Sequence, residues 1–547
     1  MNISFGKFKW NIFYSPAVNW SIILFGIVLR LRHYFENRSL WLDEAYVALN
    51  ILYTPFQKIL YNQPIIVEQP ASPLGFSILV KSFSMLLGGQ ELVLRLFPFL
   101  ASLASIYLFY HLIRRVLSAP VIPIALFFFA SCDALIHYGA ELKPYATDAF
   151  FTLLLYVMYS WVSRNPEDCK KYLCMGLLGW VVIWFSFPGI ILLASLGIVM
   201  FFQVSSKLRV YLLLIYIFWM MNVGLIYKVL IAPMWGSHYI MGTNAQFYIP
   251  APVWTHDGFS WLIDSWKGMF IYPLGQSTVF LSGMLMLLGI ISFWRSHRAW
   301  CFAFLLPLFF ALVAACLKKY PFFGRHLLFL VPILIIFIGQ GVYRVISFPK
   351  KLNFLVGILL LSYLNFFPVK ATAQHVIDGY DVEQNRQVMT YLMKNYQEGD
   401  PIFYNTSTQY MFMYYFNQWN RKEDFLYAFS GKRGEVWHGL RVGKIGDTLI
   451  TLDTQKDIAF IYEILLYDLN RNYTGKVFFP NRRSRMVQHL SGFVEDVQKS
   501  KRNWLILSHA KPELKKKLLD VIEKDGVIEE RLELRGASIY LFRMGKK

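Results

Sequence analysis

The chain has few charged residues and few cysteines. Asp, Glu, Lys and Arg make up 16% of its 547 residues, whereas 56% are hydrophobic and the mean hydropathy is +0.41. This composition predicts a protein that is mostly embedded in lipid. The five cysteines have no metal-ligand spacing, and none follows Cys316. The last third of the chain therefore has to fold without a disulfide.

Acidic residues are scarce, with 34 Asp and Glu against 54 Lys and Arg, which gives a net charge of +20. The basic residues lie between apolar runs or in the tail, an arrangement that argues against nucleic-acid binding. Their charge instead suits membrane topology, anionic lipid headgroups and a phosphate-bearing substrate. We find no internal repeat and no low-complexity tract.

Long apolar runs dominate the first two thirds of the chain. The run at 171–203 is too long for one helix, and Ser186-Phe187-Pro188-Gly189 predicts a break into two short helices. No small-residue cleavage site follows the first run, so it predicts an uncleaved helix. About eleven membrane spans are expected, from that broken run and from runs at 17–33, 91–113, 119–138, 147–163, 208–228, 276–294, 299–316, 326–345 and 352–368.

A shorter run, 73–88, has Lys81 in its middle, and a central Lys costs ~2.5–3.5 kcal/mol on the insertion scale. If 73–88 is a surface helix, the basic links between spans fall on one side of the membrane, as the positive-inside rule requires. This topology places the loops at 34–72 and 229–275, the link at 317–325 and the tail outside. Arg30 and Arg32 are then on the wrong side, which interfacial snorkelling would explain.

The two long outer loops predict interfacial elements. Residues 46–52, directly after an acidic pair, have the pattern of an amphipathic helix lying in the interface. The loop at 229–275 carries four tryptophans and two histidines, and a second interfacial element is expected there.

The composition changes near residue 370, where apolar runs become short and charges are interspersed. Strands are predicted at 401–404, 504–507 and 538–542, and helices at 383–397, 407–417, 485–499 and 511–524. The fold class expected is a polytopic α-helical membrane domain, 1–369, plus an extracytoplasmic α/β domain, 370–547. The tail has no nucleophile signature, so it is expected to dock an acceptor or to close the active site; the alternative is a cap that only stabilises the protein.

The first acidic motif is Trp41-Leu42-Asp43-Glu44-Ala45. Carboxylates at the edge of lipid are costly, so a functional site is the default hypothesis. Asp43 is a candidate general base; alternatively, Asp43 is a helix N-cap and Glu44 a favourable charge in the first turn. Glu68, at the end of the same loop, is either a polar wall of a site or a solvated loop charge.

The second acidic motif, Glu141-Leu142-Lys143-Pro144-Tyr145-Ala146-Thr147-Asp148, follows His137 and Tyr138. These ionisable groups either form a site or are a lysine–carboxylate network that caps the next helix. A third outer element, 318–326, contains Lys318, Lys319 and Arg325; the two lysines fit interfacial anchors, and Arg325 fits a bidentate phosphate ligand.

Basic and acidic groups at one face of a membrane suit one reaction. A sugar linked to lipid phosphate needs a basic pocket for the phosphate, and the acceptor hydroxyl needs a carboxylate base. Phosphate is a good leaving group, so no strong general acid is required.

The motifs resemble the GT-C glycosyltransferases, most closely the branch of protein O-mannosyltransferases and lipid A aminoarabinose transferases (glycosyltransferase family 39 and its bacterial relatives). The resemblance rests on Arg30 with 39–45, on Gly88, Glu91 and Arg95, on Glu141-Leu142-Lys143-Pro144-Tyr145 with Asp148, on Tyr320-Pro321 with Gly324-Arg325-His326, and in the tail on 399–404, 504–509 and 536–541.

This resemblance implies inverting transfer from a polyprenyl-phosphate sugar to a hydroxyl of a glycolipid, polysaccharide or protein. Asp43 looks like the catalytic carboxylate, with Glu44 beside it and Asp148 as a second acid. Lys143 and Arg325 look like donor-phosphate contacts, and Glu68, Glu141, Tyr145 and His326 complete the substrate-binding set. Two departures are Lys143, where the family commonly has Arg, and Gln69, where the lipid A enzyme has Lys. The family includes metal-dependent members, but no clear ligand set stands in the sequence, and a divalent metal stays unassigned.

The implied location is the inner (plasma) membrane, with the active site and tail on the periplasmic side. Partners are membrane lipid, the lipid-linked donor and the acceptor, and no nucleic acid. One alternative is a lipid-linked sugar transporter or flippase, which would need polar groups near the midplane of its spans. Another is a polymerase or ligase of surface polysaccharide, which would use diphosphate-linked donors.

Overall fold

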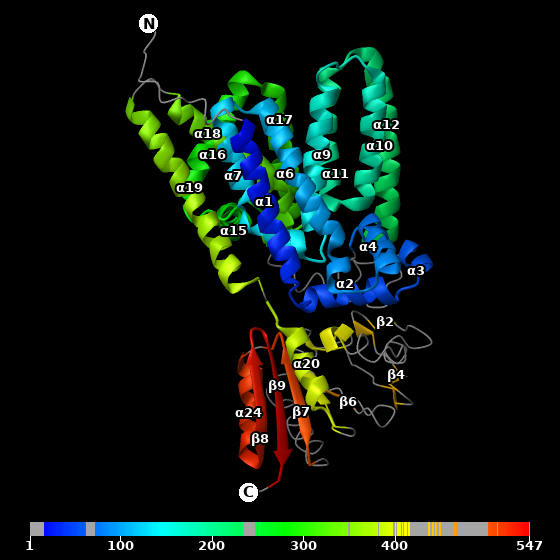
Figure 1. Cartoon of the computed structure of the whole chain (residues 1–547). Coiled ribbons are helices and arrows are strands. Elements are labelled where there is room, and N and C mark those ends of the chain that lie inside the picture. The colour runs from blue at the N-terminus through cyan, green and yellow to red at the C-terminus, as the bar shows by residue number, and fades with distance from the viewer. Residues whose placement is uncertain are drawn as a thin grey trace. The chain divides into compact units, whose positions relative to one another are not determined.

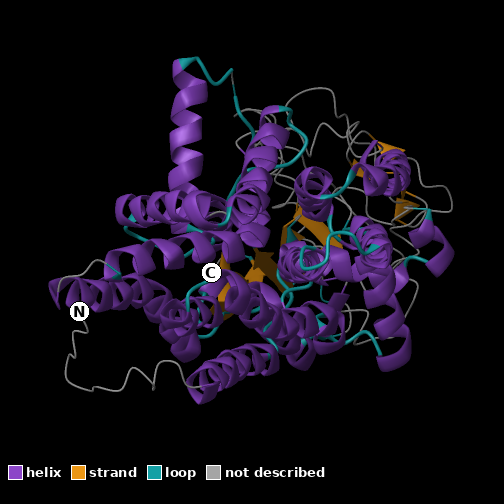
Figure 2. Ribbon diagram, turned by 90° about the horizontal axis from the view of Figure 1, so that it is seen from above, coloured by secondary structure: helices purple, strands orange, loops and turns teal. Residues whose placement is uncertain are grey.

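The computed structural model describes most of the membrane domain and parts of the tail. The described residues are 16–61, 72–232, 247–250, 252–347, 351–380, 382–397, 400, 402–405, 407–408, 410–412, 414–415, 436–437, 440–441, 444–445, 448–449, 464–467, 501–510 and 512–545. They form two compact units. The first comprises Met1–Asn37, Ala71–Pro233 and Gly242–Tyr380, and the second comprises Arg38–Pro70, Met234–Met241 and Asp381–Lys547. Helices make up most of the described chain, and strands occur only after residue 400 within it (Figure 2).

The first unit is helical, as its apolar runs predict (Figure 1). Its longer helices are α1 (Pro16–Glu36), α4 (Leu74–Leu87), α6 (Leu96–Val116), α9 (Tyr145–Val162), α10 (Cys169–Phe185), α11 (Phe187–Gln203), α12 (Ser206–Ile226), α15 (His256–Ile271), α16 (Val279–Ser296), α17 (Arg298–Cys316), α18 (Val331–Ile346) and α19 (Lys351–Asp378). Short helical segments lie between them: α5 (Glu91–Leu94), η2 (Ala119–Val121), α7 (Ile122–Ala130), α8 (Asp133–His137), η3 (Tyr138–Ala140), η4 (Tyr227–Ile231) and η6 (Gly324–Leu330).

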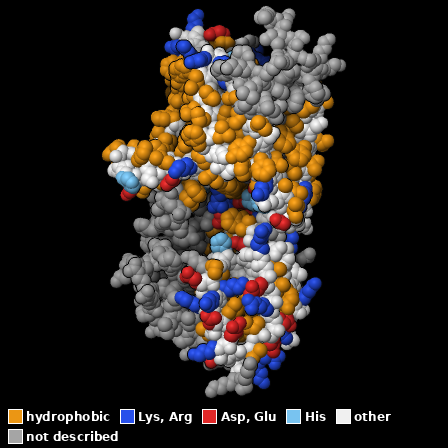
Figure 3. Space-filling model, turned by 90° about the vertical axis from the view of Figure 1, so that its left-hand side faces the viewer, with side chains coloured by type: hydrophobic (Ala, Val, Ile, Leu, Met, Phe, Trp, Pro, Cys, Tyr) orange, Lys and Arg blue, Asp and Glu red, His pale blue; other side chains and the backbone are white. Residues whose placement is uncertain are grey.

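Five helical segments of the described chain are long and apolar enough to cross a membrane, or six if the bent pair Ala119–Ala130 and Asp133–Ala140 forms one span. Large hydrophobic side chains on these helices are exposed, among them Met221, Phe280 and Phe309. Hydrophobic side chains cover a broad area of the surface drawn in Figure 3. Such a surface suits lipid rather than water. The unit is therefore a multi-pass membrane domain, while the count of about eleven spans stays a prediction.

One sequence-based expectation about the helices is confirmed, and a second gains support. The long run breaks at Ser186, whose hydroxyl accepts a hydrogen bond from the Gly189 amide at 3.1 Å and so caps the start of α11. The run at 73–88 forms α4, which has 14 residues. At 1.5 Å per residue α4 is too short to cross a hydrocarbon core of about 30 Å, and its length favours the surface position.

The helices of this unit pack closely where glycines face a neighbouring backbone. An added Cβ at Gly289 of α16 would come within 1.9 Å of the Phe337 carbonyl oxygen on α18, and one at Gly341 of α18 within 1.9 Å of the Leu285 oxygen. Small residues at such crossings let two helices approach closely in a membrane. At these two glycines the backbones of α16 and α18 approach so closely that no larger residue would fit.

The second unit carries the predicted α/β fold. Its main sheet has the order β6-β1-β7-β9-β8, in which β1 and β7 are parallel and the other neighbours antiparallel. The strands are β1 (Ile402–Asn405), β6 (Ile464–Tyr467), β7 (Asn503–Ser508), β8 (Gly526–Leu534) and β9 (Ala537–Met544). Two small hairpins pair β2 (Val436–Trp437) with β3 (Leu440–Arg441) and β4 (Lys444–Ile445) with β5 (Thr448–Leu449). The helices are α2 (Leu42–Tyr53), α3 (Phe56–Leu60), α20 (Asn385–Asn395) and α24 (Pro512–Asp525).

The core of this sheet forms where α24 packs on it. Leu514, Leu518 and Ile522 recur on one face of α24 and contact inward-facing side chains of β1, β7 and β9, including Phe403, Leu505 and Phe542. This spacing of three to four residues places the apolar positions of a helix on one side. The predicted strands β1, β7 and β9 and helices α20 and α24 are confirmed. The helix predicted at 485–499 lies outside the described residues.

The predicted topology can be tested with single cysteines in a variant that lacks the five native ones. Because Lys and Arg gather in alternate links, we expect cysteines at His256 and Lys318 to react from outside with an impermeant maleimide in intact cells. Cysteines at Glu167 and His297 should react only after lysis. All four positions are exposed. Labelling of Lys318→Cys only after lysis would contradict the outward orientation.

Candidate functional site

The start of α9 gathers part of the second acidic motif. Pro144 occupies the N-cap, Tyr145 is the first helical residue, and the Lys143 amide donates to the Glu141 carbonyl oxygen at 2.7 Å. A helix N-terminus carries partial positive charge, and Lys143 lies just before it. The N-cap residue Pro144 makes no side-chain hydrogen bond to α9, whose first turn carries Asp148. The helix N-terminus and Lys143 both favour an anion.

Arg325 and His326 meet Tyr145 from a distant segment. Gly324, at φ +49°, allows the chain to turn into η6. The Arg325 guanidinium carbon then lies 5.5 Å from the centroid of the Tyr145 ring, and the His326 ring lies 5.5 Å from it, nearly perpendicular. The Tyr320 hydroxyl donates to the His326 carbonyl oxygen at 2.8 Å. The structure therefore brings three predicted binding residues, Tyr145, Arg325 and His326, around one aromatic ring.

Glu141 lies in a cluster of polar side chains, most of which the sequence motifs did not reveal. The His137 Nε2 lies 3.1 Å from the Glu141 carboxylate, and the His137 ring stacks on Tyr380 at 5.3 Å. Asp133 pairs with His375 at 2.8 Å and accepts from the Tyr380 hydroxyl at 2.6 Å. The signal available was an ionisable residue, Asp133, inside an otherwise apolar run.

The Tyr272 hydroxyl donates to Tyr138 at 2.5 Å, beside these groups. Burial raises the pKa of Tyr272, and the charges of Glu141 and Asp133 raise it further, whereas Arg325 lowers it. The ring of its partner Tyr138 packs edge to face against the rings of His137 and Tyr145, at 5.0 and 5.1 Å between centroids. Tyr272 is thus a polar wall residue of this site that the motifs did not reveal.

Asp148, predicted as a second acid, is fixed at the break between α10 and α11. Its carboxylate accepts a hydrogen bond from the Ser186 hydroxyl at 2.6 Å. The side chain is 5% exposed. This contact gives Asp148 a role in holding the break, and its role as a second acid stays a prediction.

Arg30 does not snorkel, contrary to the sequence-based expectation. It is 2% exposed and donates to Ser102 Oγ at 2.9 Å, to the Gly26 carbonyl at 3.1 Å and to the Ala130 carbonyl at 3.0 Å. Ala130 ends α7, so the guanidinium caps the negative end of that helix. Arg30 thereby ties α1, α6 and α7 together. Arg32 is part-exposed and pairs with Glu36 at 3.7 Å.

The first acidic motif forms the start of α2 in the second unit. The N-cap of α2 is Trp41, so the expectation that Asp43 is an N-cap is wrong, and both acids lie in the first turn. Glu44 pairs with Arg38 at 3.2 Å, and both side chains are at most 1% exposed. Asp43, 8% exposed, points in a different direction on the helix. The pairing favours a structural role for Glu44 over a catalytic one.

The roles expected for Glu68 and for a divalent metal stay predictions. Glu68 lies outside the described residues. Among the residues that the structure describes, no three His, Cys, Asp or Glu side chains are grouped closely enough to hold a metal ion. A divalent metal therefore stays unassigned.

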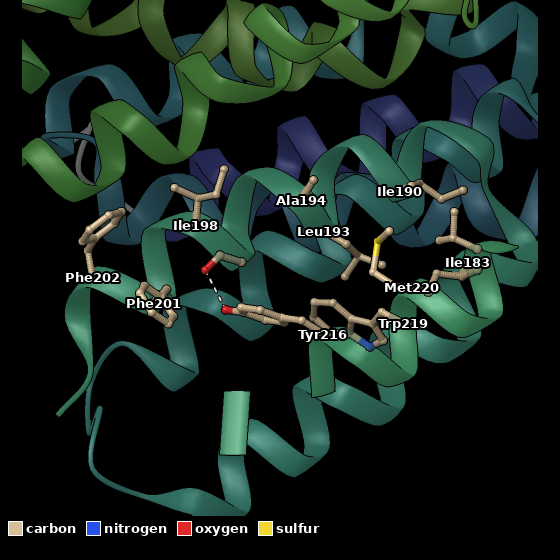
Figure 4. Close-up of a pocket in the computed structure, with 12 residues that line it drawn as sticks. Ile183, Ile190, Leu193, Ala194, Ile198, Phe201, Phe202, Tyr216, Trp219 and Met220 are labelled. Carbon is tan, nitrogen blue, oxygen red and sulfur yellow. Dashed lines mark hydrogen bonds between the residues drawn. The ribbon is translucent and has the colours of Figure 1, made fainter. Parts of the chain in front are cut away.

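An apolar pocket of about 400 Å³ lies between α10, α11 and α12 (Figure 4). Aliphatic and aromatic side chains such as Leu193, Phe201 and Trp219 line it, and none of its lining residues is charged. The Tyr216 hydroxyl there donates to the Gly197 carbonyl at 2.6 Å. Such a lining suits hydrocarbon and excludes this pocket as a phosphate site.

The chain matches no known family in a scan against protein-family models, and a search of curated proteins finds no match either. It is similar to the crystal structure of the Archaeoglobus fulgidus oligosaccharyltransferase in complex with Zn and sulfate, with 14% identity and a TM-score of 0.44. That likeness covers 73% of this chain and 57% of that chain, so the chain spans little more than half of the archaeal protein. It is also similar to ArnT from Cupriavidus metallidurans, in the apo state (12% identity, TM-score 0.48, 96% and 98% covered) and bound to undecaprenyl phosphate (12%, 0.42, 98% and 98%).

Proposed function

We propose that the protein is an inverting glycosyltransferase that moves a sugar from a polyprenyl-phosphate donor to a hydroxyl acceptor at the membrane. The observation that carries this proposal is the group at the start of α9. There, Lys143 precedes the helix N-terminus, and Arg325 lies over Tyr145, in a unit whose surface is built for lipid. A donor with a phosphate on a long hydrocarbon chain matches both properties.

In this proposal Lys143 and Arg325 bind the donor phosphate, and Glu141, Tyr145 and His326 contact the sugar-phosphate. Asp43 takes the proton of the acceptor hydroxyl. The acceptor oxygen forms a bond to the anomeric carbon as the bond from that carbon to the phosphate oxygen breaks. The electron pair of the broken bond leaves with polyprenyl phosphate, and attack from the opposite face inverts the anomeric centre.

The test is turnover by the purified full-length protein with a panel of radiolabelled polyprenyl-phosphate sugars. We expect release of polyprenyl phosphate, by transfer or by slow hydrolysis, with at least one sugar. A transporter or flippase would move donor between leaflets of a vesicle and release none. Turnover only with diphosphate-linked donors would instead identify a polymerase or ligase.

The phosphate contacts predict the behaviour of two variants. Each of Arg325→Ala and Lys143→Ala removes a charge-assisted hydrogen bond of ~1.5–3 kcal/mol, so we expect the donor KM to rise by roughly 10- to 150-fold. Lys267→Ala is the matched control, because Lys267 is more than half exposed and lies in an ion pair at 3.5 Å with Asp264. An unchanged donor KM in both variants would place the phosphate elsewhere.

A further inference from the structure

Glu383 in the second unit is bound to the start of the helix that carries Asp43. Its carboxylate accepts a hydrogen bond from the Leu42 amide at 3.1 Å. Leu42 is the first residue of α2 and Asp43 the second, and the N-cap residue Trp41 makes no side-chain hydrogen bond to the helix. The first amides of a helix have no partner within it. Glu383 therefore supplies an acceptor for one of them, and its negative charge suits the helix N-terminus.

The segment just before α2 is bound by the same part of the tail. Asn385 Nδ2 donates to the Leu40 carbonyl oxygen at 2.9 Å, and the Leu40 amide donates to the Tyr415 hydroxyl at 2.9 Å. The Ser39 hydroxyl donates to Gln387 Oε1 at 3.0 Å. Both backbone polar groups of Leu40 are thus held by side chains of the tail, immediately before α2 begins.

A buried polar network fixes Glu383 itself, whose side chain is 2% exposed. Its carboxylate also accepts from Asn385 Nδ2 at 3.0 Å, and its other oxygen lies 2.7 Å from His509 Nδ1. The hydroxyl of Ser508, the last residue of β7, donates to Asn385 Oδ1 at 2.7 Å. Hydrogen-bonded networks in a protein interior hold one arrangement. The acceptor of the Leu42 amide therefore has a fixed place at the end of β7.

We propose that Glu383 is a positioning residue for Asp43: by binding the Leu42 amide, it fixes the first turn of α2 and so the direction of the adjoining carboxylate. This inference rests on the proposed role of Asp43 as the base. A base has to lie within hydrogen-bond reach of the proton that it takes, and a misplacement of about 1 Å can cost about 10²-fold in rate. The C-terminal α/β domain then has a part in the reaction, where the sequence indicated docking, closure or a stabilising cap.

Asp400 provides a matched control for Glu383. It is also a buried acid of the tail, 6% exposed. Its carboxylate accepts from Trp504 Nε1 at 2.9 Å and pairs with Arg502 at 3.1 Å. These partners lie at the start of β7, at the opposite end of the strand from Ser508. We therefore expect Asp400→Ala to weaken the sheet as Glu383→Ala does, without loosening α2.

The first test needs no turnover. Hydrogen–deuterium exchange of the full-length protein, read by mass spectrometry, measures the opening of the backbone at 40–45. We expect Glu383→Ala to speed exchange there by about 10-fold or more, because a hydrogen bond to a charged acceptor is lost, and Asp400→Ala to leave it at the wild-type rate. Tyr415→Phe removes the acceptor of the Leu40 amide and should also speed it, which decides the matter if Glu383→Ala does not fold. Wild-type exchange in the folded variants would overturn the proposal, whatever the protein catalyses.

The second test separates positioning from folding by comparing kcat with KM. Rates are expressed per protein that binds donor, so a loss of folded protein alone leaves kcat unchanged. We expect Glu383→Ala to lower kcat by about 10²-fold with the donor KM within about twofold of wild type, because the base is displaced and the phosphate contacts are not. Glu383→Gln keeps an oxygen for the Leu42 amide and should be at least about 10-fold faster than Glu383→Ala. A wild-type kcat in Glu383→Ala, or an equal fall in Asp400→Ala, would overturn the proposal.

The two tests separate two kinds of failure. No turnover of any donor by the wild type would refute the proposed function, and with it the positioning role of Glu383; faster exchange at 40–45 in Glu383→Ala would then show only that the tail anchors α2. Wild-type turnover with unchanged exchange in Glu383→Ala would leave the function standing and refute the role of Glu383.

Discussion

Asp43→Asn is expected to lower the rate of sugar transfer by roughly 10²–10⁴-fold, the usual contribution of a general base. The amide matches the carboxylate in size but cannot accept the proton of the acceptor hydroxyl. Because Asp43 lies in the first turn of α2 and does not cap it, the substitution should leave the helix intact. The measurement is kcat with saturating donor, together with equilibrium binding of the donor, which should be unchanged.

The matched control for this variant is Asp257→Asn. Asp257 is also an aspartate in the first turn of a helix, α15, and its side chain is 80% exposed. We expect this variant to turn over at the wild-type rate. A folded Asp43→Asn protein with a near-normal rate would show that Asp43 is not the base.

Arg38→Met is expected to destabilise the protein by ~3–5 kcal/mol, the usual result of removing one partner from a buried ion pair. Glu44 would keep its negative charge at 0% exposure without the guanidinium 3.2 Å away. The double variant Arg38→Met with Glu44→Leu should regain much of the loss, because no buried charge then lacks a partner. Thermal unfolding in one detergent measures both effects.

The exposed ion pair Arg531–Glu533 provides the comparison for this prediction. Arg531→Met should change stability by no more than ~1 kcal/mol, since exposed pairs contribute little. If Arg38→Met were equally mild, or if the double variant were no more stable than Arg38→Met alone, Glu44 would not depend on Arg38. A catalytic role for Glu44 would then regain support.

Several elements were predictable because their signals are local. The break at Ser186 follows from Pro188 and Gly189 beside a capping hydroxyl, and β7 and β9 follow from short apolar stretches. The strand β8 was missed because its residues Gly526–Leu534 are rich in Glu and Arg, and their exposure simply alternates along an edge of the sheet. The helix α19 runs to Asp378, past the predicted boundary at 369/370. The sequence suggests a boundary there because the apolar run ends at Pro368 and the remaining turns of the helix are polar.

The sequence by itself determined the membrane class, most helices and the α/β tail, and it supplied the motif residues. These features depend on the hydrophobicity and turn residues of each short segment of the chain. Only the tertiary structure decided which partner each charge has. Arg30 reaches Ala130 across 100 residues, and His509 reaches Glu383 across 126. Such pairings depend on how separate segments pack, and no spacing within one segment encodes them. The same packing directs Glu44 to Arg38.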